Sequence, residues 1–258
     1  MSPYFGARVP ILEVACFNQE SAVVAARAGA DRVELCKDYC LGGLSPKPEV
    51  LQKLRSQITI PIYAMIRPHA DGFYYKESDF EVMKETLNSL KSIGADGFVF
   101  GILTESPQNC GPNASWVDVS RNKQLVQLAE GRPCTFHRAF DLIPESHWET
   151  ALADIRDCGF ASILTNGGPS GTKAAECMDK LQTLVRYQAE LEGHRKLHTH
   201  KFPEIIVGGG VRAANIGLLH MTTGASAFHS AAFLASESFT CADEVSEMKH
   251  KISQAREG

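Results

Sequence analysis

The chain has 258 residues and a formal net charge of −4, with 44% hydrophobic and 22% charged residues. These proportions are typical of a globular protein and offer no basic surface for nucleic acid or an anionic membrane. No apolar run is long enough to span a bilayer, and the first residues lack the pattern of a secretory signal. We therefore expect a cytoplasmic protein whose eight cysteines are reduced.

Eight short apolar or β-branched segments recur along the chain and predict buried strands. They begin at Ile11, Arg32, Ile60, Gly97, Cys134, Ser162, Glu204 and Ala225. Most of the stretches between them favour amphipathic helices. One helix is expected with Ser45 as its N-cap and Pro46 in its first turn, and another is expected to end at Gly94.

The repeated alternation of strand and helix predicts a single (β/α)8 TIM barrel over residues 1–258, an α/β fold. A charged stretch at about 188–203 is expected to be a loop insertion. The rival architecture is a doubly wound open sheet, which has helices on both faces and usually fewer strands.

The fifth predicted strand runs into the mixed segment TFHRAFD at 135–141. Alternation along a strand points Thr135 and His137 into the barrel and Phe136 toward the helices. Arg138 and Asp141 then lie at the C-terminal end of the strand, where TIM barrels carry their active sites. The segment therefore predicts a core strand that leads into a functional mouth.

Other strands bring polar groups to the same mouth, and the inward or strand-end residues are Glu13, Ala15, Glu34, Cys36, Arg67, His229 and Ser230. Inward carboxylates need cationic partners, and Arg67 and Arg138 are the cations expected nearby. The candidate catalytic residues are Glu13, Glu34, Arg67, His137, Arg138 and Asp141. Glu13, Glu34 and His137 are suited to proton transfer. The alternative is a structural network of ion pairs that closes the barrel.

Three consecutive glycines, Gly208, Gly209 and Gly210, stand between the seventh strand and the next helix. In phosphate-binding barrels the loops after strands seven and eight hold the anion through backbone N–H groups. Together with Arg138, the glycines predict a site for a small anionic ligand. The alternative is a tight turn that needs glycine for its backbone angles.

Two cysteines, Cys36 and Cys40, follow the second strand in the segment CKDYC. Two thiolates suffice for a Cu(I) site of low coordination number, whereas a structural zinc site needs four ligands. Free cysteines also behave as small apolar residues, so the same pair is compatible with no metal.

The motifs LEVACFNQESA, GADRVELC, GGLSP, IPIYAMIRP, TFHRAFD, ILTNGG, GGGVR and FHSAA occur in this order between Leu12 and Ala232. This series resembles the CutC family of copper homeostasis proteins. The resemblance implies a (β/α)8 barrel, a homo-oligomer (a dimer or larger), a cytoplasmic location that in animals includes the nucleus, and a role in binding Cu(I).

By this resemblance the strand-2 cysteine of the family falls on Cys36, whereas its strand-1 cysteine falls on Ala15. The chain carries Cys16 instead, and a shift of one residue turns the side chain to the opposite face of the strand. The first hypothesis is a copper homeostasis protein that binds Cu(I) weakly through Cys36 and either Cys16 or Cys40. The second is a TIM-barrel enzyme that acts on a small anionic or phosphorylated metabolite.

Overall fold

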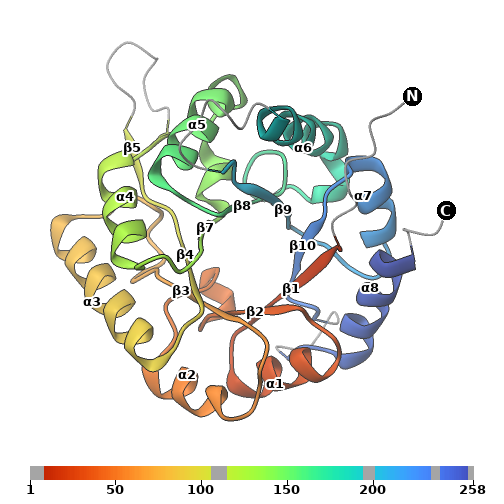
Figure 1. The fold of residues 1–258 in the computed structure, drawn as a ribbon, viewed down its shortest axis with the longest axis horizontal. Helices are drawn as coiled ribbons and strands as arrows, with labels where there is room; N and C mark the ends of the chain where they lie inside the picture. The colour runs from red at the N-terminus through yellow and green to blue at the C-terminus, as the bar shows by residue number, and fades with distance from the viewer. Residues whose placement is uncertain (1–8, 106–114, 194–200, 234–238, 255–258) are drawn as a thin grey trace.

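A computed structural model describes residues 9–105, 115–193, 201–233 and 239–254. Eight parallel strands form a closed barrel in the order β1-β10-β9-β8-β7-β4-β3-β2 (Figure 1). The barrel strands are β1 (Ile11–Cys16), β2 (Arg32–Leu35), β3 (Ile62–Met65), β4 (Gly97–Phe100), β7 (Cys134–Phe136), β8 (Ser162–Thr165), β9 (Glu204–Val207) and β10 (Ala227–Ser230). The expected TIM barrel is confirmed, and the open sheet is excluded.

A ring of helices surrounds the strands, as the outer layer of Figure 1 shows. The helices are α1 (Gln19–Arg27), α2 (Pro48–Arg55), α3 (Glu77–Ile93), α4 (Val119–Leu128), α5 (Trp148–Cys158), α6 (Met178–Gly193), α7 (Ile216–Thr223) and α8 (Ala242–Gln254). Gly94 ends α3 with a φ of 100°, as expected. Ser45 is not the N-cap of α2, because its hydroxyl bonds to the backbone of Arg67 and the helix begins at Pro48.

Two features of the connections differ from the sequence-based expectation. A short antiparallel hairpin of β5 (Leu103–Glu105) and β6 (Ser115–Val117) follows β4, where only a strand end was expected. The expected loop at 188–203 is partly helical, since α6 continues to Gly193; residues 194–200 lie outside the described residues. A charged helix end and a solvated loop have similar sequences, so the predicted start of the loop was placed too early.

The two faces of the strands build separate apolar layers. Leu12, Val14 and Cys16 belong to the large core between strands and helices. Cys36, Tyr63, Met65 and Val99 form a small cluster inside the barrel. The predicted inward and outward parity of β1 and β2 is therefore confirmed. In the described part of the chain, no helix has the length and apolar character needed to cross a membrane.

Candidate functional site

The mouth of the barrel holds a pocket of about 250 Å³ at the C-terminal ends of the strands. Its wall includes ten of the residues singled out in the sequence: Ala15, Glu34, Cys36, Arg67, His137, Arg138, Gly209, Gly210, His229 and Ser230. It also includes residues that the sequence did not single out, chiefly Phe17, Tyr39, Phe73 and Arg212. Glu13 and Asp141 bond to residues of this wall, and neither they nor Gly208 line it.

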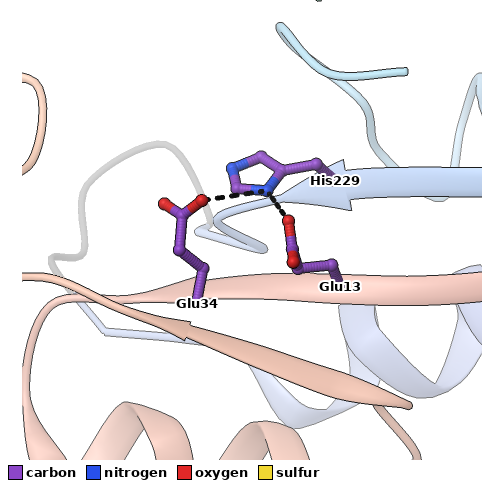
Figure 2. Close-up of side chains that lie close together, drawn as sticks. All are labelled: Glu13, Glu34 and His229. Atoms are coloured by element: carbon purple, nitrogen blue, oxygen red, sulfur yellow. Dashed lines mark hydrogen bonds and ion pairs between the residues drawn. The ribbon is translucent and has the colours of Figure 1, made fainter. Parts of the chain in front are cut away.

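A buried cluster of two carboxylates and one imidazole lies against the pocket, and Figure 2 shows both carboxylates directed at the same ring nitrogen. Glu13 Oε1 is 2.8 Å from His229 Nδ1, and Glu34 Oε2 is 4.0 Å from it. The other oxygen of Glu13 pairs with Arg32 Nε at 2.5 Å. The Cys36 thiol donates to Glu34 Oε1 over 3.2 Å. Barrel closure makes this contact, because Glu13 is paired with Arg32 on one side and with His229 on the other.

The charges in this cluster follow from burial and neighbours. Burial alone raises the pKa of Glu13, but Arg32 and His229 outweigh it and lower that pKa to about 2. The pKa of Glu34 is raised, chiefly by burial and also by the charge of Glu13. Burial lowers the pKa of His229, yet the two carboxylates raise it above its usual value. The neighbouring charges therefore favour the anionic form of Glu13 and the cationic form of His229, whereas burial favours the neutral form of Glu34.

The prediction of which cations pair with these carboxylates was wrong. Arg67 and Arg138 were expected to pair with Glu13 and Glu34, whereas Arg32 and His229 do so. Arg32 starts β2, two residues before Glu34 and on the same face, so alternation alone was enough to place it inside. Its guanidinium also lies over the ring of Tyr63, with 4.2 Å to the ring centroid.

Arg67 fixes the rim of the pocket. Its Nη1 donates to the carbonyls of Leu41, Gly42 and Gly43 over 3.0–3.2 Å. These carbonyls lie at the end of the 3-10 helix Tyr39–Leu41, in the loop that follows β2. The guanidinium also packs on the ring of Phe73. Arg67 therefore holds a loop in place, and its Nε is left without a partner among the described residues.

Arg138 is held by one nitrogen only. Its Nε donates to Asp141 Oδ2 over 2.7 Å. The other oxygen of Asp141 accepts from the hydroxyl of Thr165 at 2.6 Å and from the backbone N–H of Asn166 at 3.2 Å. Burial raises the pKa of Asp141 against the opposing effect of Arg138. Asp141 thus positions Arg138 at the mouth and is itself withdrawn from it.

His137 is a neutral imidazole with a defined tautomer. Burial, followed by the nearby charge of Arg67, lowers its pKa to about 3. Its Nδ1 accepts from the backbone N–H of Ala139 at 3.3 Å, so the neutral ring carries its proton on Nε2. The ring packs against Phe73, with 4.6 Å between the centroids. A base with so low a pKa is poorly matched to proton transfer near pH 7, but its Nε2–H can donate a hydrogen bond.

Four side chains of the pocket wall keep a buried polar atom without a hydrogen-bond partner among the described residues. These atoms are Glu34 Oε2, Arg67 Nε, His137 Nε2 and Arg138 Nη2. An unpaired buried polar group costs about 1–3 kcal/mol, so folded proteins rarely leave one without a reason. Four such atoms around one pocket indicate that a polar ligand or water completes their hydrogen bonds.

The glycine loop separates into two parts. Gly208 continues the sheet, because its N–H donates to the carbonyl of Thr165. Gly209 and Gly210 have φ angles of 93° and 73°, which only glycine adopts readily, and they line the pocket. Their carbonyls accept from Ala174 N–H and the Asn215 side chain. Helix α7 begins later than expected, at Ile216, so the loop and not the helix end borders the mouth.

The three cysteines proposed as metal ligands do not converge. Cys36 lines the pocket, and burial followed by Glu34 raises the pKa of its thiol well above the usual value. Cys16 faces the helices, as predicted, with its Sγ 4.0 Å from the hydroxyl of Thr240. Cys40 is exposed on the rim. The cluster of Glu13, Glu34 and His229 offers oxygen and nitrogen atoms, which do not favour Cu(I) over harder metals.

Some residues and contacts of the site were not predicted from the sequence, and the reasons differ. His229 was noted at a strand end, but its contact with Glu13 depends on the closure of β10 onto β1. Arg212, in the segment GGGVR, donates to Ser230 Oγ at 3.0 Å and lines the pocket. Phe17 and Tyr39 lie in loops, where strand alternation carries no information.

The closed barrel and the polar pocket at the C-terminal ends of its strands define a TIM-barrel protein with a pocket at the end where such barrels carry their active sites. The chain belongs to the CutC family, whose model matches residues 10–234. It is 35% identical to the family protein CutC of Enterobacter sp. (strain 638) over 222 residues, which cover 86% of this chain and 80% of that protein.

Solved structures agree with this assignment. A CutC protein of Streptococcus agalactiae, named for copper homeostasis, is 28% identical with a TM-score of 0.74, covering 86% of this chain and 99% of its own. A phosphoribosyl anthranilate isomerase is 15% identical with a TM-score of 0.57, covering 95% and 99% of the two chains. At that identity, the second likeness concerns the fold alone.

The low pKa of His137 predicts that wild type loses more folding stability at acid pH than a variant without this ring. The unfolded state binds a proton near pH 6.5 and the folded state only near pH 3, so folding stability falls as the pH drops through this window. His137→Gln removes the titrating ring. Urea unfolding should show wild type losing about 2.5 kcal/mol more than this variant between pH 7 and pH 4.5, at about 1.4 kcal/mol per pKa unit. Exposed His250→Gln is the control, and equal losses in His137→Gln and wild type would contradict the prediction.

The buried cluster predicts a second titration. Glu34→Gln removes the negative charge that raises the pKa of His229 most, so this pKa should fall. NMR of the His229 ring nitrogens measures the change directly. In wild type the raised pKa stabilises the fold at low pH, and that contribution is lost as the pH rises through the folded pKa. Glu34→Gln is preferable to Glu13→Gln, which leaves Arg32 buried without its partner. A pKa of His229 unchanged in Glu34→Gln would show that Glu34 does not act on His229 as an anion.

Proposed function

We propose that the mouth of the barrel binds a small organic anion and that the pair Glu34 and His229 exchanges a proton with it. The observation that carries the proposal is the set of buried atoms without partners among the described residues of one pocket wall: Glu34 Oε2, Arg67 Nε, His137 Nε2 and Arg138 Nη2. Three of the four are hydrogen-bond donors, and two of these belong to the full cations Arg67 and Arg138. Their donors and charge match an anionic oxygen better than a neutral group.

The loop after β9 supports the same ligand. Gly209 and Gly210 expose backbone close to the pocket, and a side chain on Gly209 would meet Asn166 Cβ at 2.9 Å. The carbonyl groups of Gly209 and Gly210 both accept hydrogen bonds. Because a trans peptide points its N–H opposite to its C=O, the N–H group that follows each carbonyl points away from that bond. Arg212 adds a second cation to this part of the wall. His229 of the acid–base pair lies on β10, next to β9, and Glu34 lies on β2, with both side chains in the wall of the same pocket.

Arg138 and the glycine loop predict anion-dependent stability. Phosphate at about ten times its dissociation constant should stabilise wild type by about 1.4 kcal/mol, or a few degrees in Tm. Arg138→Ala should abolish this shift, since it removes the cation at the mouth. Thermal unfolding in phosphate, in sulfate and in a neutral osmolyte separates specific binding from a general salt effect. A wild-type shift no larger in phosphate than in sulfate would leave only the structural role of these residues.

A second candidate function is weak Cu(I) binding in cytoplasmic copper homeostasis. It is favoured by the thiol of Cys36 in the pocket wall and by the name of the related Streptococcus agalactiae protein. The free cysteines of the described residues support a reducing compartment. One thiol with a raised pKa makes a weaker site than two convergent thiolates, and metal binding must displace its proton.

The homo-oligomer stays a prediction, which light scattering tests.

The cysteine geometry predicts unequal effects of two substitutions. Cys36→Ser should remove Cu(I) binding, and Cys16→Ser should change it little, because Cys16 lies on the helix side of β1. Titration against a competing Cu(I) chelator measures both variants. Binding should strengthen with rising pH as the thiol loses its proton. Equal loss in both variants would show that Cys16 reaches the site.

A further inference from the structure

The pocket has two chemically different sides. Phe17, Tyr39 and Phe73 follow β1, β2 and β3, whereas Arg138 follows β7 and Arg212 follows β9. In the barrel order, β1 lies opposite β7 and β3 lies opposite β9, as the ring of strands in Figure 1 shows. The residues that follow these strands therefore place an aromatic side of the mouth opposite a cationic side.

The aromatic side has a fixed structure. Phe17, Tyr39 and Phe233 pack together, with ring centroids 4.8–5.9 Å apart. Tyr39 is nevertheless 50% exposed, although it is a large aromatic residue. Its loop is fixed by the bridge between Lys37 and Leu44 and by the bonds from Arg67. A ring held rigidly at the edge of a pocket is ready to stack against a ligand at little cost in conformational entropy.

The cationic side is equally fixed. Asp141 holds Arg138 Nε and leaves Nη2 without a partner among the described residues. Arg212 Nη1 donates to Val211 O at 2.7 Å and to Ser230 Oγ at 3.0 Å. The pocket of about 250 Å³ lies just below the range of about 300–1,000 Å³ found for drug-sized ligands, so a single ring with one charged group suits it.

We propose that the ligand of this pocket is an organic anion bearing an aromatic ring. The anionic group lies against Arg138 and the loop of Gly209 and Gly210, and the ring stacks on Tyr39. This inference rests on the proposed anion site and adds the class of molecule that it takes. The carboxyl of Glu34 and the ring of His229 then face the middle of the ligand, between its ring and its anionic group.

Phenyl phosphate and inorganic phosphate test this arrangement by isothermal titration calorimetry on the wild-type protein. Phenyl phosphate should bind about tenfold more tightly, as expected for one added stacking contact. Tyr39→Leu keeps an apolar contact with Phe233 but removes the ring. It should lose most of that tenfold preference while its affinity for inorganic phosphate is unchanged. Tyr74→Leu, an exposed tyrosine outside the mouth, is the matched control and should behave as wild type.

Each other outcome has a definite meaning. Equal affinities for the two phosphates in wild type would overturn the aromatic half and leave the anion site standing. Tight binding of phenyl phosphate that is the same in Tyr39→Leu would overturn the placement of the ring. Binding of neither phosphate would overturn the anion site and, with it, this inference. Circular dichroism of Tyr39→Leu confirms that the half-exposed position tolerates the change.

Discussion

The ion pair between Glu13 and Arg32 is the interaction on which the rest of the site depends. A fully buried carboxylate is very costly unless its charge is compensated and its oxygens are bonded. Arg32 and His229 meet both needs, one on each oxygen. The charge of Glu34, followed by the bond and charge of Glu13, raises the pKa of His229, and burial followed by the charge of Glu13 raises the pKa of Glu34. The buried anion of Glu13 therefore contributes to the protonation of two groups that face the pocket.

The arginines of the mouth have divided roles, which their bonds reveal and their positions do not. Arg67 uses its Nη1 on three backbone carbonyls and shapes the rim. Arg138 is anchored through Nε by Asp141 and retains a free edge. A guanidinium carries five donors in a fixed plane, so an arginine held on one edge still presents another. Arg67 also keeps its Nε without a partner among the described residues, so each arginine has a donor for an anion and the two differ in what their other donors hold.

Membership of the CutC family and the chemistry of the pocket bear on function in different ways. The family link draws attention to Cys36, which lies in the pocket wall as a protonated thiol bonded to Glu34. The wall around it is built of donors, a carboxyl group and aromatic rings, which are means of holding an organic molecule. A copper role through Cys36 and a ligand role through Arg138 would use the same pocket, so each would exclude or modulate the other.

The sequence by itself determined the barrel, the end that carries the mouth and the direction of most strand residues. It could do so because hydrophobic period and strand alternation are local properties. The outward direction of Cys16 and the inward direction of Glu34 and His137 follow from that alternation alone. The partners of these groups were decided only by the tertiary structure. Closure of the ring sets Glu13 beside His229, 216 residues away, and no local pattern encodes that contact. Likewise, the loop around Tyr39 takes its shape from the bonds of Arg67, whose distance in sequence hides the connection.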